Sequence, residues 1–241
     1  MTAVVISQPM LFPWPGFFEQ LMLADGYIYL DDAQFSKGSF TNRIQLLGGE
    51  DRSWMTVPLA GKGSFQKIRD LSGTADNWRA SHRSLLRQSL GGAPYIDDAL
   101  AIFDEVYAAE CLCDLLIASI EAPARYMGIG IERLVQRSSD MAVEGTSWQR
   151  VLDLVLQAGG TRYLTGHGAA KYLDHQAFEA SGVHVEYMNY SCTPWPQPRE
   201  TFTPYVSVLD LIARTGPDAR KYLIPKTISW REFLKEEASV S

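Results

Sequence analysis

The sequence predicts an α/β protein, with a mainly parallel sheet flanked by helices in Rossmann-like layers and a helical insert in the middle of the chain. The apolar run Val4, Val5 and Ile6 indicates a buried first strand, and a helix-like apolar segment follows at residues 17–23. Strands and helices alternate again over residues 131–188, which is typical of parallel strands joined by right-handed crossovers. Between these parts, residues 77–126 carry apolar side chains at helical spacing.

We therefore expect one domain over residues 1–241, built from three consecutive parts. These are an α/β part at 1–75, a helical segment at 76–128, and a second α/β part with a tail at 129–241. The 46% hydrophobic content is ample for a sizeable core in a chain of this length.

In the first part, residues 27–30 predict a second strand, since they are rich in β-forming side chains. Residues 40–47 and 54–59 predict a pair of strands around a turn at 48–51. A further short strand is expected at 68–71.

In the helical segment, Pro94 interrupts the apolar spacing, and residues 99–124 predict one or two helices. We expect this helical segment to cover a cleft.

The last part begins with a strand candidate at 131–135. A helix is then expected at 147–158 with Thr146 as its cap, followed by a strand at 163–165. A helix at 171–180 and a strand at 183–188 complete the alternation. In the proline-rich tail, one helix is expected at 207–214.

Composition excludes several classes of protein. The net charge of −6 argues against a uniformly basic nucleic-acid surface, although it leaves room for a local basic cleft. The odd cysteine count without regular spacing argues against a disulfide framework and favours a cytoplasmic location. The four histidines show no zinc-binding spacing. No apolar run is long enough to span a membrane, and the first residues do not resemble a signal peptide.

Four groups of polar or aromatic residues follow predicted strands or lie in the tail. The first is Gln8 with Trp14, in a Pro/Gly-rich turn directly after the first strand. Such turns are where α/β proteins build their sites. The alternative is a turn that merely packs well, with its aromatic residues in the core.

The second group follows the second strand and comprises Asp31, Asp32 and Gln34, with Asn42 and Arg43 nearby in the chain. Arg43 offers a bidentate fork for a carboxylate or phosphate. The alternative is that the two aspartates cap a turn and Arg43 pairs with one of them at the surface.

The third group, Gly166 and His167, lies between a strand and a predicted helix that begins at Lys171. Small residues in such a position let backbone N–H groups approach an anion. The segment matches neither the Walker loop nor the dinucleotide-binding fingerprint, so no cofactor is assigned. His167 is a candidate general base, and the alternative is a structural hydrogen bonder.

The fourth group joins Trp195 and Gln197 to Ser207 and Asp210. Ser207 is placed to cap the last predicted helix, and Asp210 stands at the third helical position, as in a capping box. That structural interpretation accounts for both residues without a ligand.

Taken together, these segments resemble the WbqC-like family. The resemblance includes Gln8-Pro9, Phe12-Pro13-Trp14 and Leu30-Asp31-Asp32, and it extends over nearly the whole chain. It continues through the segments Gly16-Phe17-Phe18, Ala24-Asp25, Gln34-Phe35, Asn42-Arg43, Trp54, Val57-Pro58, Tyr163-Leu164-Thr165-Gly166, Tyr172-Leu173, Trp195, Gln197, Phe202, Pro204 and Ser207 with Leu209-Asp210-Leu211. Two positions depart from it: Ser7 stands where relatives often have His, and Trp195 where they usually have Tyr.

The resemblance implies a place in a bacterial surface-polysaccharide or secondary-metabolite pathway. It favours an acyl or aminoacyl transferase that acts on an amino-sugar or amino-acid-derived substrate, either free or linked to a carrier. We expect Asp32 and His167 to be catalytic, and the remaining candidates to bind substrate: Gln8, Trp14, Gln34, Asn42, Arg43, Gly166, Tyr172, Trp195, Gln197 and Asp210.

Two alternatives remain open. One is a nucleotide-dependent ligase or nucleotidyltransferase, because a strand that enters a Pro/Gly turn and a helix resembles the HIGH-type nucleotide-binding folds. The other is a non-catalytic binding or scaffold protein of a biosynthetic cluster. No nucleic-acid partner is expected, except a charged tRNA if one is the donor.

Overall fold

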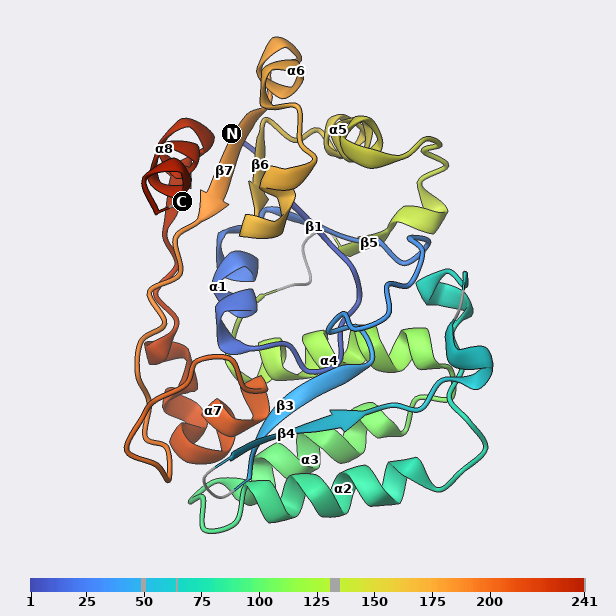
Figure 1. The fold of residues 1–241 in the computed structure, drawn as a ribbon, viewed down its shortest axis with the longest axis vertical. Helices are drawn as coiled ribbons and strands as arrows, with labels where there is room; N and C mark the ends of the chain where they lie inside the picture. The colour runs from blue at the N-terminus through green and yellow to red at the C-terminus, as the bar shows by residue number, and fades with distance from the viewer. Residues whose placement is uncertain (49–50, 64, 131–134, 241) are drawn as a thin grey trace.

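Six strands form the sheet at the centre of the computed structural model, which describes residues 1–48, 51–63, 65–130 and 135–240 (Figure 1). The strand order is β5-β2-β1-β6-β7-β8, and all neighbouring pairs are parallel except β7 with β8. The strands are β1 (Ala3–Ser7), β2 (Gly26–Tyr29), β5 (Val135–Arg137), β6 (Arg162–Thr165), β7 (His184–Met188) and β8 (Thr227–Ser229). The predicted α/β class with a mainly parallel sheet is therefore confirmed.

Helices cover both faces of this sheet, and the alternation of side chains along the strands explains how. Val5 of β1 belongs to one core cluster and Val4 to the other, because successive residues of a strand point to opposite faces. Helices α5 (Ser147–Gln157), α6 (His175–Ala180) and α8 (Trp230–Val240) pack against the Val4 face. Helices α1 (Pro15–Leu23), α2 (Trp78–Ser89), α3 (Ile96–Tyr107), α4 (Leu112–Tyr126) and α7 (Val208–Thr215) contribute to the cluster that contains Val5.

An antiparallel hairpin of β3 (Arg43–Gly48) and β4 (Asp51–Thr56) lies near α2 and α3, away from the main sheet (Figure 1). It confirms the predicted strand pair at 40–47 and 54–59, with different ends. Residues 49 and 50 of the predicted turn lie outside the described residues.

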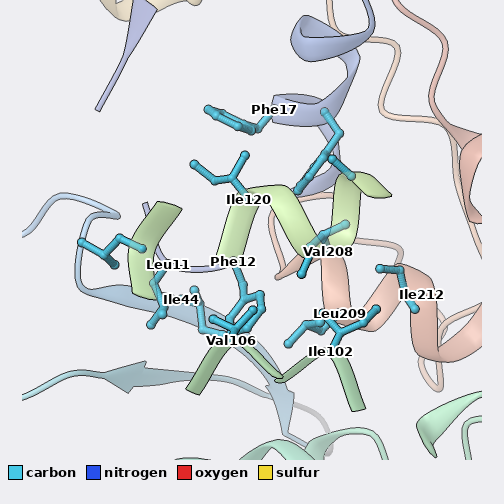
Figure 2. Packing of buried hydrophobic residues seen from close by; sticks show 14 of the residues in the cluster. Leu11, Phe12, Phe17, Ile44, Ile102, Val106, Ile120, Val208, Leu209 and Ile212 are labelled. Atoms are coloured by element: carbon cyan, nitrogen blue, oxygen red, sulfur yellow. The ribbon is translucent and has the colours of Figure 1, made fainter. Parts of the chain in front are cut away.

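The segment after β1 is held firmly in the larger core cluster. Phe12 is fully buried, and Figure 2 shows its ring among side chains that include Val106 and Leu209. Its backbone N–H donates to Ser119 Oγ of α4 at 3.0 Å, although its φ of 32° is unfavourable for a residue with a side chain. Burial of one such aromatic side chain contributes about 1.5–3 kcal/mol, which offsets this strain.

Two local predictions are wrong. Residues 68–71 do not form a strand: Ile68–Asp70 is a 3-10 helix, because the N–H groups of Ile68 and Arg69 donate to carbonyls of the loop after β2. The helix expected from residue 171 begins only at His175, where the Asp174 carboxylate accepts from the Ala177 N–H.

Other boundaries also differ from the prediction. Thr146 stands at the N-cap of α5, but its side chain makes no capping hydrogen bond. Residues 131–134 of one strand candidate lie outside the described residues, and β5 begins at Val135. Strand β8 and helix α8 in the tail were not predicted from the sequence. Within the described residues, four further 3-10 helices are Ala60–Gly63, Ser138–Asp140, His167–Lys171 and Gly216–Tyr222.

Candidate functional site

The carboxyl ends of five parallel strands meet at one edge of the sheet, where the sequence placed its candidates. Gln8 follows β1, Asp32 follows β2 and His167 follows β6, and these three strands are neighbours. The chain reverses its direction of winding between β1 and β6. Ligands of open α/β sheets bind in the crevice outside such a switch point.

Asp31 fastens the end of β2 to the end of β5. Its side chain accepts hydrogen bonds from the Ser139 N–H at 3.0 Å, from Ser139 Oγ at 2.7 Å and from Ser138 Oγ at 3.2 Å. The residue is 1% exposed. Asp31 therefore organises the edge from inside and is not available to a ligand.

Asp32 lies beside it in a different environment. Arg150 Nη2 donates to Asp32 Oδ2 at 2.6 Å, and Ser138 Oγ donates to Asp32 Oδ1 at 2.6 Å. Burial alone would raise the pKa of the Asp32 carboxyl, but the Arg150 and Ser138 hydrogen bonds outweigh it and the pKa is lowered. Asp32 is thus a carboxylate at neutral pH.

A cleft of about 610 Å³ opens next to this ion pair. That volume falls in the range of small-molecule sites. Its wall combines cations, carboxylates, an amide and hydroxyl groups, from the loop after β2, from the segment before the 3-10 helix Ile68–Asp70, and from the loop and first turn at the start of α5. The residues that line it are Leu30, Asp32, Ala33, Gln34, Phe65, Lys67, Val143, Glu144, Gly145, Thr146, Ser147, Arg150 and Val151.

Trp14 and Tyr190 form an aromatic wall at the neighbouring strand ends. Their ring centroids are 4.7 Å apart with a T-shaped geometry, and Tyr205 lies 5.5 Å from Trp14 on another side. The Trp14 ring covers Gly16 so closely that a Cβ atom there would come within 2.2 Å of it. Gln8 is half-buried, and its amide makes no hydrogen bond within the described part of the chain.

His167 lies against the same wall, with its ring 5.3 Å from that of Tyr190. Its Nε2 is 2.8 Å from the Met188 carbonyl oxygen. Since a carbonyl only accepts, Nε2 donates to it, and in the neutral form of the imidazole the lone pair then lies on Nδ1. At Gly166, an added Cβ would lie 3.2 Å from the Tyr190 hydroxyl, so the close approach of that residue favours glycine.

The structure places Asn42 and Arg43 elsewhere, in the hairpin. The Asn42 amide donates to the Val57 carbonyl at 2.9 Å, and Arg43 lies over the Trp54 ring at 4.2 Å and donates to the Gly38 carbonyl. Neither lines the 610 Å³ cleft. The alternative of a surface pair between Arg43 and an aspartate is wrong, because Asp32 pairs with Arg150 and Asp31 accepts from Ser139.

Trp195, Gln197 and Asp210 come together in a second buried cluster. Trp195 Nε1 donates to Asp210 Oδ2 at 2.8 Å, and Arg214 Nε donates to Asp210 Oδ1 at 2.9 Å. Burial raises the pKa of the Asp210 carboxyl against these favourable contacts. The expected capping box is wrong for Asp210, whereas Ser207 does cap α7 by accepting from the Leu209 N–H at 3.3 Å.

Tyr172 is 44% exposed and follows the 3-10 helix His167–Lys171. The residues that the sequence analysis missed are Lys67, Arg150 and Tyr190. Arg150 had a signal that was not used: it lies in the first turn of a helix that follows a parallel strand, and such helices begin at the carboxyl edge.

Over the described ranges, no group of three or more His, Cys, Asp and Glu side chains is arranged to hold a metal ion. In the same part of the chain, no helix is both long and apolar enough to cross a membrane.

The comparisons with known proteins agree with the resemblance in sequence. The model of the WbqC-like protein family matches residues 8–222. The chain is also 28% identical over 228 residues to the uncharacterized protein Rv1507c of Mycobacterium tuberculosis (strain ATCC 25618 / H37Rv), covering 92% of this chain and 98% of that protein. No solved structure matches the chain. The protein belongs to the WbqC-like family.

Proposed function

We propose that the protein is a transferase of a bacterial polysaccharide or secondary-metabolite pathway, which passes an acyl or aminoacyl group to an amino-sugar or amino-acid-derived substrate. The observation that carries the proposal is the 610 Å³ cleft at the carboxyl edge of the sheet, whose wall presents both signs of charge. Such a wall suits a substrate that has an ammonium group and an anionic group.

The cleft divides the recognition of such a substrate between its charged residues. The Asp32 carboxylate, together with Glu144, suits an ammonium group, and Lys67 with Arg150 suits a carboxylate or phosphate. Arg150 uses Nη2 for Asp32 and Nε for the Val143 carbonyl. No described residue accepts a hydrogen bond from its Nη1, so this donor is left for a ligand.

His167 suits the role of general base better than Asp32. Its Nδ1 carries a free lone pair, whereas the Asp32 carboxylate is stabilised in its charged form by Arg150. His167 follows β6 at the same carboxyl edge but does not line the 610 Å³ cleft, so the substrate must extend from the cleft toward β6. In the proposed step Nδ1 takes a proton from the substrate ammonium group, and the free amine then attacks the acyl carbonyl carbon. The bond from that carbon to the leaving group breaks, and the leaving group departs with the electron pair and the second proton of the amine.

The test is a binding screen by thermal shift and calorimetry with amino acids, amino sugars, nucleotide sugars and acyl-CoA thioesters. A ligand at 100 times its Kd stabilises the native state by about 2.7 kcal/mol. We expect an amine-bearing ligand to raise the Tm of the native protein and to bind about tenfold more weakly to Lys67→Ala, as expected when a charged hydrogen bond is lost.

Arg69→Ala is the matched control, because Arg69 is two residues away, pairs with Asp70 and does not line the cleft. Equal binding to native protein and Lys67→Ala would contradict the proposed site. Group transfer from acyl donors is followed by mass spectrometry of the products. If a ligand binds but no group is transferred to it, the transferase proposal fails and the protein is a binding protein.

The strand order favours a second candidate, a nucleotide-dependent ligase or nucleotidyltransferase. Numbered along the chain, the six strands follow the order 3-2-1-4-5-6 that is typical of sheets built from mononucleotide-binding halves, with the difference that the sixth strand, β8, is antiparallel. ATP and CTP therefore belong in the same screen. A Tm shift with a nucleotide and with none of the amine or acyl ligands would select this candidate over the transferase.

A further inference from the structure

His167 is held from two sides by aromatic rings that come from distant parts of the chain. Tyr190, just after β7, lies 5.3 Å from its ring centroid with an interplanar angle of 43°. Phe233, from α8, lies 4.9 Å away at 47°. With the bond from Nε2 to the Met188 carbonyl, these contacts fix three sides of the imidazole and leave Nδ1 unbonded among the described residues.

Phe233 is coupled to the same strand that accepts the His167 hydrogen bond. Its ring is 4% exposed and stacks on Tyr187 with centroids 4.1 Å apart and an interplanar angle of 10°. Tyr187 and Met188 are consecutive residues of β7. Phe233 thus packs at once on the imidazole and on the strand that supplies its hydrogen-bond acceptor.

The helix that carries Phe233 is itself anchored to α6, beside β7 (Figure 1). The Trp230 ring stacks on His175 at 4.7 Å, and its Nε1 donates to Glu179 at 2.9 Å. Arg231 adds two further hydrogen bonds to the Glu179 carboxylate. Such convergent contacts leave α8 little freedom to shift, so the position of Phe233 is well defined.

We propose that Phe233 is a positioning residue for His167, and that α8 thereby completes the candidate site. This inference rests on the proposed role of His167 as the base. It also assigns a function to the segment beyond residue 222, where the match to the family model ends. Phe233 does not act on the substrate; it keeps the imidazole with Nε2–H on Met188 and Nδ1 free.

Nuclear magnetic resonance of the whole protein tests this without a substrate. The chain has four histidines, so the His167 imidazole N–H signal can be assigned by its loss in His167→Gln. We expect the Nε2 proton to be protected in the native protein. Its exchange should be about tenfold faster in Phe233→Ala, because opening of the hydrogen bond is no longer resisted by packing.

Phe233→Leu keeps the apolar bulk in case the alanine variant does not fold, and it too should speed exchange, since leucine cannot stack on Tyr187. Leu234→Ala is the matched control, because Leu234 packs on the same core cluster from the next position of α8. Unchanged exchange in both Phe233 variants, or equal acceleration in Leu234→Ala, would overturn the proposal.

The outcome is separable from that of the proposed function. If no amine or acyl ligand binds but exchange depends on Phe233, the positioning role stands and the transferase proposal fails. If a substrate is turned over, Phe233→Leu should lower kcat about tenfold with little change in KM, as for a group that acts only in the transition state. A rise in KM with an unchanged kcat would count against the positioning role of Phe233.

Discussion

Arg150 reaches Asp32 across 118 positions of the chain and donates to its carboxylate at 2.6 Å. The ion pair joins the end of β2 to the first turn of α5 at the rim of the 610 Å³ cleft. Both side chains are largely buried: the exposed fraction is 14% for Arg150 and 13% for Asp32. Loss of either partner would leave a charge without compensation in a partly desolvated place.

We predict that Arg150→Ala lowers the free energy of unfolding by about 2–3 kcal/mol, measured by urea denaturation. The control is Arg83→Ala, because Arg83 also pairs with an aspartate, Asp104, but does so at the open surface. That variant should lose much less, since solvent screens exposed pairs. An equal loss of unfolding free energy in the two variants would show that burial does not make the Arg150–Asp32 pair more important for stability than an exposed pair.

The pH dependence of Arg150→Ala should differ from that of the native protein. The native pKa of Asp32 lies below its unfolded value of 3.8, so its stabilising contribution is present above that pH and is lost as pH falls through the native value. The difference in unfolding free energy between the native protein and Arg150→Ala should therefore shrink on acidification. A constant difference from neutral pH down to about pH 3 would contradict this.

For Glu19 we predict a pH dependence of stability with the opposite sign to that of Asp32. This carboxyl of α1 is 2% exposed and accepts from Ser191 Oγ at 3.4 Å and from the Ile224 N–H at 3.3 Å, while its Oε2 has no partner among the described residues. Burial raises the pKa of Glu19 above 4.5, against these two bonds and the charge of Lys226. The Tyr190 and Cys192 side chains also lie within its electrostatic reach.

Because the folded pKa exceeds the unfolded one, ionisation of Glu19 costs stability as pH rises from 4.5 through the folded value. Glu19→Gln removes this cost. We expect the variant to gain unfolding free energy relative to the native protein as pH rises above 4.5, in paired urea titrations. A difference that does not change with pH would mean that Glu19 ionises normally.

Gly16→Ala tests the aromatic wall. Alanine normally favours a helix over glycine by about 1 kcal/mol, but here the new Cβ would displace the Trp14 ring. Because the displaced atoms belong to the far end of a side chain, we expect a small change in Tm together with loss of the nuclear Overhauser contact between Trp14 and Tyr190. Gly168→Ala meets nothing within 4 Å and should leave that contact intact. Persistence of the contact in Gly16→Ala would overturn this geometry.

Trp195→Phe separates structure from ligand binding in the second cluster. Phenylalanine keeps the ring but leaves Asp210 without the Nε1 donor, so we expect a loss of about 1–3 kcal/mol in unfolding free energy. Trp54→Phe, at a residue that is 43% exposed, should change stability far less. If Trp195→Phe is as stable as the native protein, Trp195 is free for the substrate role that the sequence suggested.

Most strands of the sheet could be predicted because local sequence patterns indicate them. Residues 163–165 are a short run of β-forming side chains before Gly166, and residues 183–188 follow Gly182 and alternate apolar with mostly polar side chains. The segment at 68–71 was predicted wrongly, because so short a segment, Ile68 and Leu71 around two charged residues, does not distinguish a strand from a 3-10 helix held by backbone hydrogen bonds to another loop. Helix α8 was not predicted, because its many charged residues leave no clear apolar spacing around the buried Phe233.

The candidate site could be predicted only where a residue directly follows a strand. Gln8, Asp32 and His167 reach the carboxyl edge for that reason. The Arg150 partner of Asp32 depends on tertiary contact over 118 residues, and no local pattern records it. Asn42 and Arg43 are close to Asp32 along the chain, but the hairpin turns their side chains to Val57 and Trp54.

The position of β1 also constrains how the chain can be made. This strand lies between β2, which follows it within 20 residues, and β6, which begins at residue 162. At about 5–20 residues per second, a ribosome needs roughly 8–32 s to add the second neighbour. During that interval one edge of the apolar strand Ala3–Ser7 stays unpaired, so the newborn chain depends on protection from aggregation until its second half emerges.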